Sequence, residues 1–165
     1  MARIILAVAL AVLPVAAAVG LRGADASQPQ VPFPSGYREW VHVKSAVIGP
    51  EFPAYATEGG IHHIYANRTA LAGFSTGTFN DGSILVYDLL SLSEKNGIGT
   101  EGPRRRIDIM VKDSKRYAAS GGWGFARFMA DDRDHDVLTF DAAQSCYQCH
   151  QSRKAQGFVF SEFRR

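Results

Sequence analysis

The feature that most constrains this chain is a pair of cysteines followed directly by a histidine. The stretch is Cys146-Tyr147-Gln148-Cys149-His150, and it holds both cysteines of the 165-residue sequence. Cys-x-x-Cys-His is the attachment signal for c-type haem, in which each thiol bonds one vinyl group and the histidine becomes the proximal iron ligand. We therefore expect one covalently bound haem c, held by Cys146 and Cys149, with His150 as the metal ligand.

Two other uses of paired cysteines fit the sequence less well. Structural zinc takes four ligands, commonly from two paired clusters, and the sequence has no second cysteine pair. A thioredoxin-like dithiol usually opens a helix after a strand of a βαβ unit, whereas this motif lies near the C-terminus with no parallel-sheet pattern around it. Both alternatives are disfavoured but stay open at this point.

Residues 1–26 have the composition of a secretory signal peptide. One arginine precedes an apolar run over 4–18, and small residues follow before position 26. The alternative is an uncleaved membrane anchor, but the run is shorter than the roughly 20 residues of a bilayer helix and contains a proline. We expect cleavage after Ala26, export to the periplasm, where c-type haem is attached, and no stable membrane insertion afterwards.

The charge balance gives no support for a nucleic-acid partner. Lys and Arg number 18 and Asp and Glu 16, for a formal net charge of +2, and the two signs are interspersed. A nucleic-acid-binding domain usually carries a basic face. Partners must therefore be argued from sites and not from charge. We expect a small gaseous or nitrogenous ligand and no nucleic acid, with a redox partner protein as a further option.

The pattern after the signal peptide predicts a mainly antiparallel β-sheet. Residues 27–36 contain three prolines, so we expect an extended leader outside the packed core, followed by one domain over 37–165. Alternating or continuous apolar residues predict strands over 37–45, 61–66, 83–92, 106–112 and 123–129. Short helices are expected after Asn67, after Asp113 or Ser114, and over 141–150, where the helix carries the haem motif. The predicted class is α+β, mainly antiparallel β-sheet with a few short helices.

Six stretches match a known haem protein family in order along the chain. They are Tyr37-Arg38-Glu39-Trp40-Val41, Thr76-Gly77 with Phe79-Asn80-Asp81-Gly82, Val111-Lys112-Asp113-Ser114-Lys115-Arg116, Gly122-Trp123-Gly124-Phe125, the haem motif, and Val159-Phe160-Ser161-Glu162-Phe163. In these stretches the chain resembles the cytochrome P460 family, which includes the cytochromes c′-β. The resemblance implies an antiparallel β domain, a homodimer, and a five-coordinate haem c whose open side binds nitric oxide and other small ligands.

The resemblance favours the c′-β type within that family. Members named P460 oxidise hydroxylamine and carry a bond from a lysine, just before the Thr-Gly turn, to the porphyrin. Here Phe74 and Ser75 precede Thr76. The c′-β members instead cap the distal face with phenylalanines, which implies Phe74 as a cap and Phe52 as a second candidate. Lys44 remains an alternative for a cross-link.

A sixth iron ligand would make the protein an electron carrier, so each remaining histidine and two methionines are candidates. They are His42, His62, His63, His135, Met110 and Met129. His62 and His63 are neighbours on a predicted strand and point to opposite faces, so at most one faces the haem. Met129 is expected in the core, His135 in a solvated loop, and Met110 toward solvent unless the haem covers that side. We therefore expect a five-coordinate iron.

An enzyme would also need proton-accepting groups near the iron. Glu58, Asp81, Asp88 and Arg127 are the polar candidates in or beside predicted strands. Asp81 is better explained as a turn residue. Asp88 shares a predicted strand face with apolar residues, and an exposed edge position would explain it as well as a role near the iron. The basic run at 104–106 is expected to end a solvated loop, with docking of an acidic redox partner as the alternative.

The sequence thus predicts an exported mono-haem c-type cytochrome that binds nitric oxide or a related small ligand, for sensing, buffering or scavenging. One alternative is a haem-dependent oxidoreductase of the P460 type acting on hydroxylamine. The other is a six-coordinate electron-transfer cytochrome.

Overall fold

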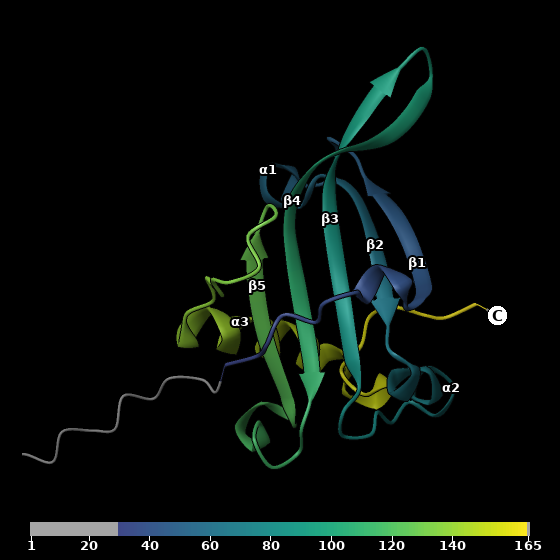
Figure 1. Ribbon diagram of the computed structural model, residues 1–165. Helices are drawn as coiled ribbons and strands as arrows, with labels where there is room; N and C mark the ends of the chain where they lie inside the picture. Colours follow the sequence, from purple (N-terminus) through teal and green to yellow (C-terminus); the bar gives the residue numbers. More distant parts are fainter. Residues whose placement is uncertain (1–29, 165) are drawn as a thin grey trace, which may run out of the picture.

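A five-stranded antiparallel sheet forms the body of the protein (Figure 1). The computed structural model describes residues 30–164. The strands follow one another in sequence order across the sheet, so every pair of neighbours is an antiparallel pair. They are β1 (Val41–Ile48), β2 (Gly60–Ala66), β3 (Ile84–Lys95), β4 (Ile98–Lys112) and β5 (Trp123–Met129). The predicted fold class is confirmed. The predicted signal peptide lies outside the described residues.

The hairpin of β3 and β4 is longer than the sequence pattern indicates, and its tip projects beyond the other strands (Figure 1). Asn96 and Gly97 form the connection with φ of 55° and 75°. Two consecutive positive φ angles twist the chain in the same sense as the strands, which is why Asn-Gly favours tight hairpins. The projecting part is polar and lacks apolar alternation, so the sequence pattern shows the turn but not the strands beside it.

The helical segments are short. They are η1 (Tyr37–Glu39), α1 (Tyr55–Glu58), η2 (Arg68–Ala72), α2 (Gly73–Thr76), η3 (Ala118–Ser120), α3 (Phe140–His150) and η4 (Gln151–Gln156). Asn67 caps η2, where its side chain accepts a hydrogen bond from the Ala70 amide, as expected from its position. Thr139 caps α3 in the same way, and the helix starts at Phe140, one residue earlier than predicted. None of the helices within 30–164 is long and apolar enough to cross a membrane.

Two predicted elements differ from the structure. The first strand does not begin at Tyr37, because Tyr37–Glu39 forms a 3-10 turn and the strand starts at Val41. The helix expected after Asp113 is a series of turns that ends in η3. In both places a short polar and aromatic run fits more than one local conformation, and packing selects the turn.

Each face of the sheet buries its own apolar cluster. On one face Ile64, Leu85 and Phe125 pack against α3 and the chain end. On the other face Ile109 and its neighbours pack against the segment that precedes β1, in which Val31 is 3% exposed. The expectation that this leader stays outside the core is therefore wrong for the described residues 30–36. Its prolines prevent regular structure, but they do not prevent the apolar residues between them from packing on the sheet.

Asp88 is fully buried on the leader-covered face, in the central strand β3. It accepts hydrogen bonds from the Tyr37 hydroxyl at 2.7 Å and from Arg38 Nε at 2.9 Å and Arg104 Nε at 2.8 Å. The alternative of an exposed edge position is thus wrong. The carboxylate is tolerated because two guanidinium groups and a hydroxyl replace its hydration.

Candidate haem-binding site

A cavity of about 580 Å³ lies on the face of the sheet that packs against α3. The strands β2 to β5 form one wall, and α3 and the segment after η4 form another. Cys146, Cys149 and His150 all line it, which brings together the three residues of the predicted attachment motif. The segment after η4 runs behind the sheet toward the C-terminus (Figure 1).

His150, the last residue of α3, is held in a defined orientation. Its Nδ1 lies 2.7 Å from the backbone oxygen of Phe158. That oxygen can only accept, so Nδ1 carries the proton and the lone pair of Nε2 is free for a metal. Burial lowers the pKa of His150, which favours the neutral imidazole that ligates iron. The rings of Phe125 and Phe160 contact the imidazole, with centroids at 5.4 and 4.9 Å.

The backbone turn that supplies this oxygen depends on Gly157. The residue ends η4 with φ of 66°, and the chain then folds back. A Cβ at this position would lie 2.7 Å from the Phe79 ring and 2.8 Å from the Gly77 oxygen. Only glycine combines the positive φ with so close an approach. The main-chain oxygen that orients His150 is thus fixed by local backbone geometry.

The two cysteines are free thiols on one side of α3. Residues three apart on a helix share a face, so both sulfurs can reach one edge of a porphyrin. Cys146 is half-buried and its burial raises the pKa of the thiol, whereas Cys149 is exposed. The donor set of two thiols, an oriented imidazole and an adjoining cavity fits a haem c.

The model of the Cytochrome P460 family matches residues 34–161. The chain belongs to the cytochrome P460 family. Membership makes it a c-type haem protein, in agreement with the motif and the cavity. No match was found among curated proteins. The c′-β subtype within the cytochrome P460 family stays a prediction.

The two phenylalanines predicted as distal caps lie in different places. Phe52 follows β1, lines the cavity and is 48% exposed. Phe74 in α2 packs against Phe79 and Phe163, with ring centroids at 5.3 and 6.0 Å, and is not among the described residues that line the cavity. The role of both residues toward the haem stays a prediction.

A charged wall of four residues borders the cavity. Asp108 of β4 accepts from Arg106 Nε at 2.8 Å and from Arg127 Nε at 2.5 Å. Arg106 also pairs with Glu58 of α1. Glu58 and Arg127 were candidates from the sequence, whereas Arg106 and Asp108 were missed as site residues. The signal was the alternation of Arg106, Asp108 and Met110 on one face of β4, but only the packing of α3 on that face makes it a cavity wall.

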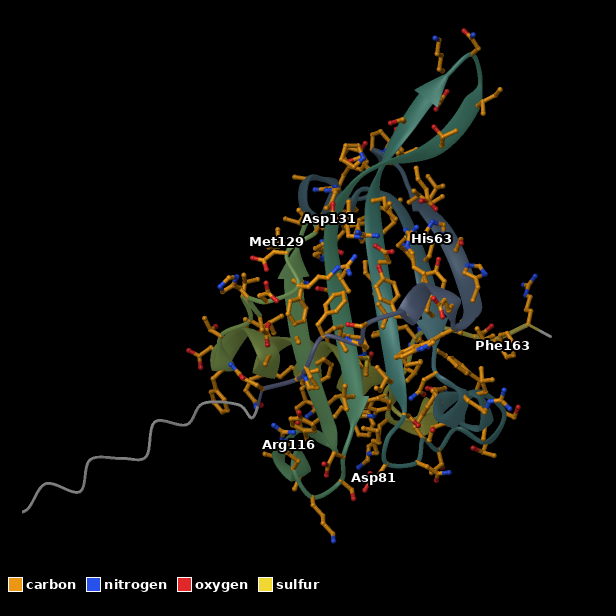
Figure 2. All side chains as sticks on the ribbon, viewed as in Figure 1. His63, Asp81, Arg116, Met129, Asp131 and Phe163 are labelled. Atoms are coloured by element: carbon orange, nitrogen blue, oxygen red, sulfur yellow. The ribbon has the colours of Figure 1, made fainter. Side chains whose placement is uncertain are left out.

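The remaining polar candidates lie outside the cavity. Asp81 accepts hydrogen bonds from the amide and hydroxyl of Ser114 at the end of the sheet, which confirms its turn role (Figure 2). Asp88 belongs to the opposite face. The run 104–106 is part of β4: Arg104 contacts Asp88, and Arg105 and Arg106 bond carbonyls of the α1 segment. The expectation of a solvated loop there is wrong.

The candidate sixth iron ligands differ in whether they line the cavity. His62 lines the cavity and His63 faces away from it, where Ser45 Oγ lies 2.6 Å from its Nδ1, so the prediction of opposite faces is confirmed. Met110 also lines the cavity, so it lies on the side of the sheet that a haem would cover and not toward solvent. Met129 is 47% exposed near the end of β5, so its expected core position is wrong (Figure 2).

The other two histidines lie at the surface. His42 contacts Ser45 Oγ at 2.8 Å. His135 is exposed and pairs with Asp132, as expected for a solvated loop.

Proposed function

We propose that this protein binds nitric oxide or a related small ligand at a five-coordinate haem c iron. Cys146 and Cys149 anchor the haem covalently, and His150 is the proximal ligand. The observation that carries the proposal is the hydrogen bond from His150 Nδ1 to Phe158 O, which leaves Nε2 free beside both thiols in one cavity. The haem supplies an iron that binds small ligands; the protein supplies orientation and the walls.

The other two possible iron ligands in the cavity are held by packing. Met110 pairs with Phe125 across β4 and β5, and the Phe125 ring contacts His150. Met110 therefore lies beside the proximal histidine and not across the cavity from it. The His62 ring is stacked on Tyr87, with centroids 4.6 Å apart and an interplanar angle of 25°. Ligation by either side chain would require that this packing be given up, which supports an open sixth position.

The charged wall also favours neutral ligands. Its two guanidinium groups and two carboxylates are mutually paired, so it presents little net charge to an incoming molecule. An anion would have to compete with Asp108 and Glu58 for the same arginines. A neutral diatomic ligand meets no such competition.

Hydroxylamine oxidation is a second candidate, since the carboxylates of Glu58 and Asp108 border the cavity and could accept protons. Lys44 pairs with the cavity-lining residue Ile64 and so lies on the cavity side of the edge strand β1. A bond from Lys44 to the porphyrin would support the enzyme, because no lysine precedes the turn at Thr76 and Gly77, where the resemblance places the cross-link.

We also propose that the chain is exported through its N-terminal signal peptide, loaded with haem in the periplasm and assembled as a homodimer. These proposals rest on residues 1–26, on the attachment motif and on the family resemblance.

The absorption spectrum of the reduced holoprotein, before and after carbon monoxide, tests the function. The expected result is a high-spin haem c spectrum that shifts promptly with the gas. A low-spin spectrum that ignores carbon monoxide would instead show a six-coordinate electron carrier. A strongly red-shifted Soret band would show a cross-linked porphyrin, and peptide mass spectrometry would then locate the lysine.

A further inference from the structure

A buried nitrogen of His62 has no hydrogen-bond partner among residues 30–164. His62 Nδ1 is buried, and no described residue hydrogen bonds to it. A buried imidazole nitrogen without a partner loses its hydration and gains nothing in return. Because His62 lines the cavity, a molecule bound there can supply the missing partner.

The position of His62 places it across the cavity from His150. His62 belongs to β2, and the His150 ring packs on Phe125 of β5. Three strand spacings of about 4.8 Å separate β2 from β5, or about 14 Å across the sheet. The two imidazoles thus line the cavity at positions about three strand spacings apart, which leaves space for a bound group between them.

The surroundings of His62 keep its ring neutral and oriented. Burial lowers its pKa, and the positive charges of Lys44 and Arg106 act in the same direction, against the carboxylate of Glu58. Tyr87 supports the ring by stacking, and the Arg106 guanidinium lies 5.6 Å from the centroid of that tyrosine ring. A neutral imidazole offers one N–H donor from a fixed position.

We propose that His62 Nδ1 donates a hydrogen bond to the outer atom of a small ligand bound at the iron. This inference rests on the proposed function and adds a preference among the small ligands that the iron could bind. A hydrogen-bond donor favours ligands whose outer atom carries negative charge when bound, such as dioxygen or azide, relative to carbon monoxide. The uncharged N–H of His62 then discriminates between bound ligands, while the arginines and carboxylates of the charged wall remain paired with one another.

Vibrational spectroscopy of the ferrous holoprotein with carbon monoxide tests the contact. In His62→Phe the C–O stretch is expected at a higher frequency than in the unmodified protein, because the donor is lost. The azide dissociation constant of the ferric form is expected to rise roughly threefold to tenfold, as for the loss of one hydrogen bond. His62→Gln keeps an N–H donor and is expected to restore much of both values.

His63→Phe is the matched control, since it changes the next residue of the same strand on the opposite face. It is expected to leave the stretch and the azide affinity unchanged. If His62→Phe does not assemble with haem, His62→Leu serves for the same comparison. Each variant is first compared with the unmodified protein in haem content.

Three results would overturn the inference. Equal C–O stretches in the His62 and His63 variants would show that His62 does not touch the ligand. A low-spin ferric protein that becomes high-spin in His62→Phe would show that His62 is itself the sixth ligand. A failure of the unmodified protein to bind carbon monoxide, with a low-spin spectrum unchanged in His62→Phe, would overturn the proposed function and this inference with it.

Discussion

The two faces of the sheet each carry an aspartate between two arginines, but only one of these clusters is sealed. Asp88 meets Arg38 and Arg104 under the leader and is 0% exposed. Asp108 meets Arg106 and Arg127 beside the cavity, and its side chain is 25% exposed. Asp108 pairs with Tyr87, the neighbour of Asp88, so the clusters sit back to back on two central strands. The same set of groups, an aspartate between two arginines, stabilises the fold where it is covered and is accessible to a ligand where it borders the cavity.

The largest effect should follow from removal of the sealed carboxylate. Asp88→Ala removes the buried carboxylate that Arg104, Arg38 and the Tyr37 hydroxyl share. We expect the free energy of unfolding to fall by about 3 to 5 kcal/mol, the usual cost of breaking a buried pair. Urea unfolding of the holoprotein measures it. A loss no greater than that of Asp108→Ala would contradict the contrast between the clusters.

Acid should destabilise the protein through the same residue. Burial alone would raise the pKa of Asp88, but hydrogen bonds from Arg104, Tyr37 and Arg38 outweigh it and lower that pKa below the ordinary value. A lowered folded-state pKa contributes stability that is present above the unfolded-state pKa and is lost as the pH falls through the folded-state value. Unfolding midpoints measured from pH 6 down to pH 2, about the range below neutrality where aspartates titrate, should fall less steeply in Asp88→Ala than in the unmodified protein.

The open cluster should respond in ligand binding more than in stability. Asp108→Asn removes one negative charge from the wall and leaves Arg106 and Arg127 in excess. We expect the ferric protein to bind azide about fivefold more tightly, as for about 1 kcal/mol of Coulomb energy in a partly solvated site. An azide titration measures this. Unchanged affinity would place the cluster outside the reach of the ligand.

The smallest effect is expected from the aromatic residues. Phe52 lines the cavity, whereas Phe74 packs against Phe79 and is not among the described lining residues. Phe52→Ala should therefore speed nitric oxide association a few-fold and more than Phe74→Ala. Stopped-flow mixing measures both rates. A larger effect of Phe74→Ala would return Phe74 to the distal face, as the family resemblance implies.

Local signals in the sequence were enough for the main elements. The spacing of Cys146, Cys149 and His150 identified the haem attachment. Apolar alternation located the five strands, but it missed the first eight residues of β4, where the hairpin is polar. The cap at Asn67 and the turn at Asn96 and Gly97 were equally visible, because each depends on the chemistry of one or two residues. The predicted strands, cap and turn are present in the structure because tertiary packing favours the same local conformations.

Tertiary structure decided which polar residues are buried and what they face. Asp88 and Asp108 have the same sequence character, and their environments differ because the leader covers one face and α3 covers the other. The orientation of His150 depends on a backbone oxygen eight residues later in the chain. The unpartnered nitrogen of His62 can meet a ligand only because several strands together form the cavity around it. The burial of a polar side chain and its hydrogen-bond partners depend on residues distant in sequence. The sequence by itself therefore determined the haem attachment and the strands, whereas only the tertiary structure determined the lining of the pocket.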